Sequence, residues 1–392
     1  MAETYKSAAG KGFDFLWSYY NTTNFEGNIW FGGNTFHTCL DYLINAGIPD
    51  TNASVVSTGY SVFNCLYSPT DWWRDDYAWW GDAFVTAIEH RGPLGLSDGK
   101  YDPLFDKITT ATLYCWQRMN NVWSEDMYGV PSDHAAGTAN IRGGVYNIPG
   151  LTCDPGQAMQ GRNSVSNEGY FLLSLGLSRL YPGSVYAQAA DDMRTWVQQF
   201  LARTPVNNPS GAVGILDAQG HVLERPMGNK ALPTWYWSGD QGLLSRALVE
   251  ANTQTARATQ IVNTAIASLK DSDGVLHENL DFVNAGLGGF LGDYATGKGI
   301  FMRSLHAVNT NGALNDFILT NAKAVWCHRG PQGSDPNQFT FNWDLNLKPN
   351  YEKTLLDSKG YPLDNIIMQA AGLDALNAAM LVVNPDTPLE CS

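Results

Sequence analysis

Hydrophobic residues recur at helical spacing along almost the whole chain, and two kinds of segment alternate. Six segments mix apolar, aromatic and small residues with few charges, which predicts helices that are buried on all sides. These segments are 37–47, 76–92, 167–183, 239–252, 293–309 and 368–384. Six other segments carry one apolar stripe and one polar face, as half-exposed helices do. These are 12–20, 58–67, 105–120, 186–203, 256–270 and 315–330.

This alternation indicates the fold class. Buried helices that take turns with half-exposed ones predict an all-α (α/α)6 barrel, in which an outer ring of helices wraps an inner ring. The segments 121–166, 204–238 and 331–364 precede buried helices and are rich in Gly, Pro, Asn and aromatic residues. We expect them to be ordered loops that wall a cleft at one end of the barrel. No linker or shift in composition interrupts the pattern, so we expect residues 1–392 to form a single domain.

Composition narrows the range of partners. The 392 residues carry a formal net charge of −14 and contain no run of Lys and Arg, which argues against nucleic acid as a partner. The 13 Trp and 18 Tyr favour a neutral carbohydrate ligand, because aromatic faces stack on the C–H faces of sugar rings. Large aromatic residues also fill cores, however. No apolar run approaches the ~20 residues that a membrane-spanning helix needs. We also expect the protein to be a monomer.

The cysteines bear on the compartment and on metal binding. Their spacing includes no CxxC pair, and no His-rich metal motif occurs, so we expect neither a metal site nor a cofactor. An even number fits an oxidising compartment with up to three disulfides, of which we expect at least two. The six cysteines are at positions 39, 65, 115, 153, 327 and 391.

Two further features concern secretion. Sequons at Asn21 and Asn52 predict glycosylation and point to a secreted protein. The amino-terminal stretch MAETYKSAAG has no apolar h-region. We therefore expect a mature extracellular chain from which a signal peptide has been removed.

The stretch DWWRDDYAWWGDAF (71–84) places Asp75 and Asp76 among four tryptophans at the start of a buried helix. Carboxylates at a helix N-terminus interact favourably with the helix dipole and can simply cap the helix. One carboxylate is enough to cap a helix, however, so capping does not explain two in succession. The four tryptophans would form an apolar surface of about the size of a sugar ring, from which water is excluded. A carboxyl pair at the mouth of a barrel is typical of glycosidic bond cleavage.

The chemistry sets geometric conditions on this pair. Carboxyl groups about 5–5.5 Å apart permit direct attack on the anomeric carbon with retention of configuration. Desolvation by tryptophan and the charge of the neighbour would raise one pKa and leave the other low. Adjacent helical residues point about 100° apart. Both aspartates can therefore face one substrate only if they lie in the first turn of the helix or just before it.

At these residues the sequence resembles glycoside hydrolase family 76, the α-1,6-mannanases. DDYAWWGDAF is similar to the DD-x-AWW signature of that family. Other stretches resemble further family segments in the same order along the chain. They are IWFGGNTFHTCLDYL (29–43), GGVYN (143–147), GRNSVSNEGYFLLSLGLSRLYP (161–182), WYWSGDQGLL (235–244) and YATGKGIFMRSL (294–305).

The resemblance implies an (α/α)6 barrel that cleaves α-1,6-mannosidic linkages of mannan by endo-acting, retaining double displacement. It implies Asp75 as the nucleophile and Asp76 as the general acid/base. Two residues depart from the family pattern. Arg162 stands where Lys is common, and Asp240 stands where Asn is expected. Asp240 would add a third carboxylate to the cleft, which puts the preferred linkage or sugar in doubt, or it could cap a helix.

Further residues are predicted to contact the substrate because they lie at helix starts or in aromatic loops. For Asn167 and Glu168 the alternative is a plain N-cap with a first-turn acid. Of Trp79 and Trp80, one should face the cleft and the other the core. The predicted contacts are Trp79, Trp80, Asn167, Glu168, Trp235, Tyr236, Asp240, Gln241 and Lys298.

Several rival functions remain open. A cell-wall transglycosidase would use the same aspartates with a sugar acceptor in place of water, and an inactive carbohydrate-binding barrel would use neither. A second pair, Asp191 and Asp192, raises the possibility of a Mg²⁺-dependent isoprenoid cyclase. That pair lies on a half-polar outer helix without a further acid at i+4, which argues against the cyclase. The histidines in loops, including His221, have no triad-like context in the sequence.

Overall fold

The structure is a computed structural model. It describes residues 3–20, 29–47, 52–66, 72–123, 143–147, 163–202, 215–224, 236–279, 296–330, 335–341, 343 and 363–391. Over these ranges the chain folds into α-helices and one short 3-10 helix, η1 (Gly99–Tyr101). Extended residues in the same ranges meet only in isolated bridges.

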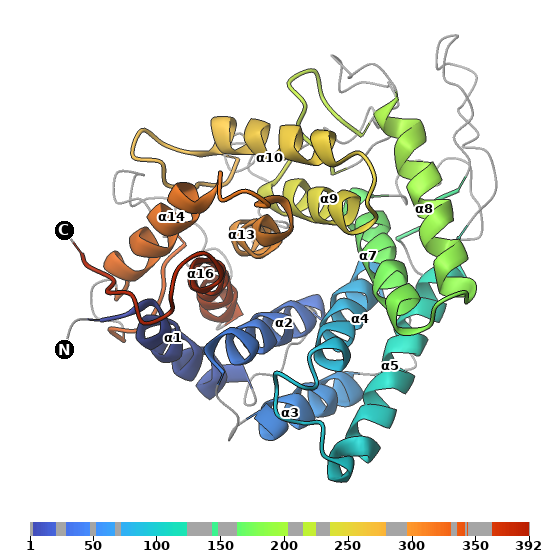
Figure 1. Ribbon diagram of the computed structural model, residues 1–392, viewed down its shortest axis with the longest axis horizontal. Helices are drawn as coiled ribbons and strands as arrows, with labels where there is room; N and C mark the ends of the chain where they lie inside the picture. The colour runs from blue at the N-terminus through green and yellow to red at the C-terminus, as the bar shows by residue number, and fades with distance from the viewer. Residues whose placement is uncertain are drawn as a thin grey trace.

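Six helices form a closed inner ring, in which each helix contacts the next and the last contacts the first (Figure 1). Glycines permit close approach within the ring. A Cβ atom on Gly242 would lie 2.8 Å from the backbone of Phe301 on the neighbouring helix, so only glycine fits there. The inner helices are α2 (Ile29–Ala46), α4 (Arg74–Glu89), α7 (Ser164–Leu180), α9 (Ser238–Glu250), α13 (Gly297–Val308) and α16 (Leu363–Val382).

Six further helices surround this ring, and each packs its apolar stripe against inner helices. The all-α (α/α)6 barrel predicted from the hydrophobic pattern is confirmed. Buried residues of both rings form one continuous hydrophobic core. The outer helices are α1 (Tyr5–Tyr20), α3 (Asn52–Leu66), α5 (Asp102–Asn120), α8 (Val185–Leu201), α10 (Thr255–Leu269) and α14 (Asn315–Cys327).

All six inner helices begin at the same end of the barrel, because each outer helix returns the chain to that end. Close contacts join the starts of neighbouring inner helices. A Cβ atom on Gly169 of α7 would meet the Ala78 side chain of α4, and one on Gly297 of α13 would meet Ser238 of α9. We call this end the mouth of the barrel. The helix N-termini make it a region of positive backbone potential.

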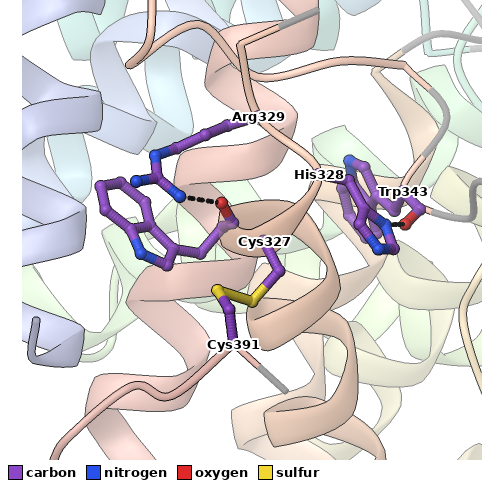
Figure 2. Close-up of a disulfide and its surroundings, with 6 residues drawn as sticks. Cys327, His328, Arg329, Trp343 and Cys391 are labelled. Carbon is purple, nitrogen blue, oxygen red and sulfur yellow. Dashed lines mark hydrogen bonds between the residues drawn. A yellow bond between two sulfur atoms is a disulfide. The ribbon is translucent and has the colours of Figure 1, made fainter.

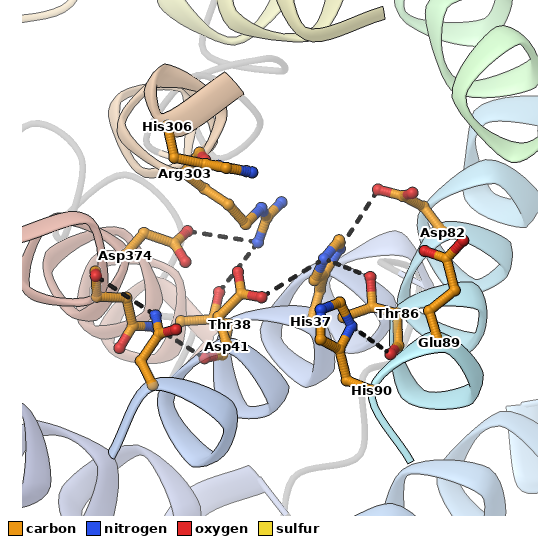
Figure 3. A network of polar contacts seen from close by, with 12 residues as sticks. His37, Thr38, Asp41, Asp82, Thr86, Glu89, His90, Arg303, His306 and Asp374 are labelled. Carbon is orange, nitrogen blue, oxygen red and sulfur yellow. Dashed lines mark hydrogen bonds and ion pairs between the residues drawn. The ribbon is translucent and has the colours of Figure 1, made fainter. Parts of the chain in front are cut away.

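Beyond the mouth, a network of buried charges links the inner helices (Figure 3). Arg246 of α9 donates to both carboxylate oxygens of Asp82 on α4, at 2.8 and 3.2 Å. Arg303 of α13 donates to the side chain of Asn34 on α2 at 2.6 Å and lies 3.5 Å from the carboxylate of Asp374 on α16. These contacts tie non-adjacent segments across the barrel, and they compensate the cost of the buried charges.

Burial in this network shifts two pKa values. Burial raises the pKa of Asp374 to about 7, because desolvation outweighs the opposing charge of Arg303. Burial lowers the pKa of His37 well below its usual value, and the charges of Arg303 and Arg246 lower it further. His37 is therefore neutral at pH 7. Its ring nitrogen lies 3.0 Å from the hydroxyl of Thr86.

The two ends of the chain lie side by side and close the outer ring (Figure 1). The backbone N–H of Leu389 donates to the carbonyl of Glu3 at 2.7 Å. A disulfide joins Cys327, the last residue of α14, to Cys391, with the two Cα atoms 5.5 Å apart (Figure 2). Beside it, the guanidinium of Arg329 lies 3.4 Å from the centre of the Trp326 ring. The C-terminal tail is thus held against the barrel.

The remaining cysteines correct a sequence-based expectation. Cys39 and Cys115 are buried free thiols, and Cys65 is an exposed free thiol. Cys153 lies outside the described residues. The expectation of at least two disulfides is therefore wrong. The reason is that Cys39 and Cys115 pack into the core as small hydrophobic residues.

The prediction of glycosylation at Asn52, one of the two sequons, is also corrected. Asn52 is fully buried at the first position of α3, and its amide donates to the carbonyl of Leu94 at 2.9 Å. A glycan on this nitrogen is incompatible with the folded state. Asn21 lies outside the described residues. Within the described part of the chain, no helix combines the length and hydropathy that a membrane crossing requires.

Candidate active site

Asp75 and Asp76 lie in the first turn of α4, at the mouth of the barrel. The residue before the helix, Trp73, makes no side-chain cap. Asn147 replaces the missing cap from a distant segment. Its side-chain oxygen accepts from the backbone N–H groups of Arg74 and Asp75, at 2.9 and 3.1 Å. The N-cap position of α4 is thus served by Asn147 and not by the aspartates, which follow it in the first turn.

Asp75 is half-buried, whereas Asp76 is 7% exposed. The Oδ1 atom of Asp75 is shielded from solvent and has no hydrogen-bond partner among the described residues. Burial raises the pKa of Asp75 to about 6, and the charge of Glu224 raises it as well. Hydrogen bonds from Asn147 and from the backbone N–H groups of Asp75 and Asp76 oppose this rise. The Asp75 carboxyl is thus mostly ionised at pH 7 and takes up a proton in mild acid.

The aromatic residues around the pair have different roles. Trp73 is 49% exposed at the rim, while Trp72 is buried and stacks on Tyr77 with ring centres 5.0 Å apart. Trp79 packs against Trp30 of α2, with ring centres 5.3 Å apart. Trp73 is thus the one tryptophan of the DWWRDDYAWW stretch that presents a large surface to solvent.

Trp80 is a core residue, which corrects its assignment as a substrate contact. Its side chain has no exposed surface and packs among Phe36, Phe63 and Phe84. Its indole N–H donates to the carbonyl of Ile29 at 3.1 Å. The physical reason is the helical rotation of about 100° per residue, which turns Trp80 away from the side that Trp79 faces.

A buried pair of carboxyl groups lies near the starts of the next two inner helices. Glu168 of α7 is 1% exposed and Asp240 of α9 is fully buried. The two carboxyl groups share a hydrogen bond, and no described N–H group donates to either oxygen of Glu168. Burial raises the pKa of Glu168 well above its usual value, and the charge of Asp240 raises it further. A protonated Glu168 is a hydrogen-bond donor, unlike an ordinary glutamate at neutral pH.

A further carboxylate, Glu278, was not predicted from the sequence. It accepts hydrogen bonds from the backbone N–H and the hydroxyl of Ser238, at 2.9 and 2.5 Å, and from the N–H of Asn279 at 3.1 Å. Burial raises its pKa, and the nearby charge of Lys298 opposes that rise. Glu278 lies after the outer helix α10 and is 40 residues from Ser238 in the sequence. No local sequence pattern could therefore predict this contact.

Lys298 is at the second position of α13 and is 1% exposed. Its ammonium donates to the carbonyl of Phe341 and lies 4.4 and 4.3 Å from the ring centres of Phe341 and Trp343. These partners, together with the charge of Glu278, offset the unfavourable helix dipole at that position. The structure thus supplies protein partners for Lys298, while its predicted contact with substrate remains a prediction.

Asn167 and Gln241 hold the backbone of the mouth, and this corrects their assignment as substrate contacts. The Asn167 amide bonds the N–H and the carbonyl of Val145, at 2.8 and 3.2 Å. The Gln241 amide bonds the N–H and the carbonyl of Val222, at 2.7 and 2.8 Å. Both side chains are fully buried. Each amide also donates to the carbonyl four residues earlier, so its donors and acceptor are used within the protein.

Tyr236 is half-buried and stacks on the His221 ring, with centres 3.9 Å apart. His221 lies 2.8 Å from the carboxylate of Asp217 and 2.7 Å from the hydroxyl of Ser268, the order found in a catalytic triad. This arrangement was not predicted from the sequence. Ser268 is in the last turn of α10, where free carbonyls rather than N–H groups face outward, so a developing oxyanion would be disfavoured. These contacts therefore join the 215–224 loop to α10.

Some predicted residues cannot be placed. Trp235 and Arg162 lie outside the described residues, as do most of the loops expected to wall the cleft. Within the described residues, no group of three His, Cys, Asp or Glu side chains is arranged to hold a metal ion.

Solved structures share this architecture at low sequence identity. Lin0763 from Listeria innocua has a TM-score of 0.64 at 15% identity and covers 96% of this chain and 97% of its own. Dfg5 from Chaetomium thermophilum, in complex with glucosamine, has a TM-score of 0.62 at 17% identity and covers 98% of this chain and 92% of its own.

An inactive variant of the α-1,6-mannanase GH76A of Salegentibacter sp. HEL1_6, in complex with α-1,6-mannotriose, is also similar. Its TM-score is 0.61 at 17% identity, with 97% of this chain and 100% of that chain covered. The sequence itself matches no protein-family model and no curated protein. The chain has the fold of the glycoside hydrolase family 76 structures, an all-α toroidal barrel.

Proposed function

We propose that the protein is a retaining, endo-acting glycoside hydrolase that cleaves α-1,6-mannosidic linkages. The observation that carries this proposal is the position of Asp75 and Asp76. They lie in the first turn of α4 at the mouth of the barrel, and Asn147 caps the helix in their place. The capping of α4 by Asn147 means that the aspartates are not needed as the N-cap residue of this helix. The buried carboxyl groups of Glu168 and Asp240 lie near the starts of the next two inner helices.

In the proposed mechanism the ionised Asp75 attacks the anomeric carbon, while Asp76 donates a proton to the leaving glycosidic oxygen. The bond between that carbon and oxygen breaks, and a glycosyl ester forms on Asp75. Asp76, now a carboxylate, removes a proton from water as the water attacks the anomeric carbon. Asp75 leaves as a carboxylate, and two inversions at the same carbon produce net retention.

Similar structures support this choice of chemistry. In the Salegentibacter enzyme, replacement of two consecutive aspartates by asparagine or by alanine gives inactive variants, which bind α-1,6-mannotriose and α-1,6-mannotetraose. The same pair type and the same fold occur in this chain. Linear α-1,6-mannan is therefore the substrate to be tested first.

A cell-wall transglycosidase is the second candidate function. The structural similarity to Dfg5 in complex with glucosamine supports it. Both activities pass through the same glycosyl ester on Asp75. They differ in the second step, in which either water or a sugar hydroxyl attacks. Product masses obtained with and without an added mannooligosaccharide acceptor distinguish hydrolysis from transfer.

The test uses Asp75→Asn and Asp76→Asn, each of which should lower turnover of α-1,6-mannan by at least about a thousandfold. The matched control is Asp191→Asn with Asp192→Asn, the other aspartate pair of the chain. The hydrogen bonds that the structure shows for Asp191 and Asp192 are with residues of their own outer helix, α8, and that variant should keep full activity. Wild-type turnover in either Asp75→Asn or Asp76→Asn would refute the mechanism. An inverted first product, followed by NMR, would refute direct attack by Asp75.

A further inference from the structure

A cavity lies between two outer helices, outside the inner ring. Its volume is about 350 Å³, at the small end of the range for small-molecule sites. Helices α3 and α5, which form its sides, run next to each other on the outer wall (Figure 1). The lining residues are Tyr60, Phe63 and Asn64 of α3 and Asp106, Lys107, Thr110, Ala111 and Tyr114 of α5.

Three polar groups of this cavity have no partner among the described residues, whereas the Thr110 hydroxyl donates to the carbonyl of Asp106. The Asn64 amide, the Asp106 carboxylate and the Lys107 ammonium are exposed, and none makes a hydrogen bond or ion pair with another described residue. On the neighbouring outer helix α8, by contrast, Arg194 pairs with Asp191. Unused donors and acceptors beside an aromatic surface are the combination that holds a hydroxyl-rich ring.

The cavity connects to the candidate active site through aromatic contacts. Tyr114 packs edge-on against Tyr77, with ring centres 5.9 Å apart, and Tyr77 directly follows Asp76 in α4. Phe63 packs edge-on against Trp72, with ring centres 5.8 Å apart. The end of the cavity at Tyr114 is therefore at the level of the mouth, and the end at Asp106 is lower on the outer wall.

We propose that this cavity is a distal subsite that binds a neutral glycan chain leaving the mouth of the barrel. This inference rests on the proposed function, because the occupant is the same α-1,6-mannan. The two tyrosines supply faces for sugar rings, and Asn64, Asp106 and Lys107 supply hydrogen bonds to hydroxyl groups. The net charge of −14 disfavours a polyanionic occupant.

The test compares a long substrate with a short one. Asn64→Ala with Lys107→Ala removes two exposed polar partners, and adding Tyr60→Ala removes a stacking face. In the triple variant we expect the KM for polymeric α-1,6-mannan to rise about tenfold with kcat unchanged. The KM for α-1,6-mannotetraose should not change, because so short a ligand occupies the mouth alone. The matched control is Tyr181→Ala, which removes an exposed tyrosine (39%) from another part of the surface.

A binding assay separates this inference from the proposed function. Migration of the catalytically intact protein through a native gel that contains α-1,6-mannan reports binding without any need for cleavage. Retardation that is weaker in the double or triple variant than in wild type supports the subsite even if wild-type protein does not cleave mannan. The subsite is overturned if wild-type protein is not retarded, or if the variants are retarded as strongly as wild type. Equal melting temperatures of the double variant and wild type show that the fold is intact.

Discussion

The Asn147→Ala variant tests how the protein sets the ionisation of Asp75. Asn147 donates one of the hydrogen bonds that oppose the rise in the Asp75 pKa, which burial has already brought to about 6. A hydrogen bond to a charged group contributes about 1.5–3 kcal/mol, and one pKa unit corresponds to about 1.4 kcal/mol. Loss of the Asn147 side chain should therefore raise the pKa of Asp75 by about one unit or more.

The sign of the effect on activity follows from the proposed role of Asp75. The nucleophile must be ionised, so kcat/KM falls as pH drops through the pKa of the free enzyme. In wild type this acid limb should lie near pH 6. In Asn147→Ala it should lie at about pH 7 or above, which lowers kcat/KM at pH 5 by a further factor of about ten. At pH 8 the two proteins should differ little.

The assay is the rate of α-1,6-mannan cleavage from pH 4 to pH 9, at substrate concentrations well below KM. Asn309→Ala is the control. Asn309 accepts from the backbone N–H of Leu314 at 2.9 Å just before α14, so this variant loses a comparable helix-start contact away from Asp75. Its acid limb should coincide with that of wild type. An unchanged acid limb in Asn147→Ala would refute the claim that Asn147 controls the Asp75 carboxyl.

Three further predictions concern stability. Arg246→Met leaves Asp82 buried without its bidentate partner and should cost about 3–5 kcal/mol in urea unfolding, whereas a cost below about 1 kcal/mol would show that the pair is solvated. Cys391→Ser opens a disulfide whose cysteines are 64 residues apart and should lower the unfolding free energy by up to about 4 kcal/mol under non-reducing conditions; equal stability of the two proteins would contradict this. The pKa of Asp374, about 7 in the fold, lies above that of an unfolded aspartate, so its contribution is fully present below pH 4 and is lost as pH rises through 7. Asp374→Asn should therefore flatten the fall in melting temperature between pH 4 and pH 8, and an unchanged slope would contradict the shift.

The helices of both rings could be predicted from the sequence, but α1, α2 and α3 begin at Tyr5, Ile29 and Asn52, well before their predicted starts at 12, 37 and 58. The hydrophobic period reports burial directly, because a helix enclosed on all sides is apolar on all sides. The helix predicted at 37–47 in fact begins at Ile29, because aromatic residues and glycines before His37 continue the helix into the mouth. The first-turn position required of Asp75 and Asp76 could be stated in advance for the same reason, since it depends on local helix geometry alone.

Residue roles at the mouth could not be predicted in the same way. Asn167 and Gln241 are polar residues near helix starts, which is equally typical of ligand contact and of backbone support. Only the tertiary structure brings the backbone of Val145 close to the Asn167 amide and the backbone of Val222 close to the Gln241 amide. These hydrogen bonds occupy both side-chain amides.

The sequence by itself determined which segments are helical, which of them are enclosed, and that two acids begin one enclosed helix. These are properties of residues close together in the chain. Tertiary structure alone decided that Asn147 caps α4 from 72 positions away, that Glu278 is held by Ser238, and that Trp80 is in the core. Each of these depends on which distant segments meet when the ring closes, and the pKa of a carboxyl depends on those neighbours more than on its own chemistry.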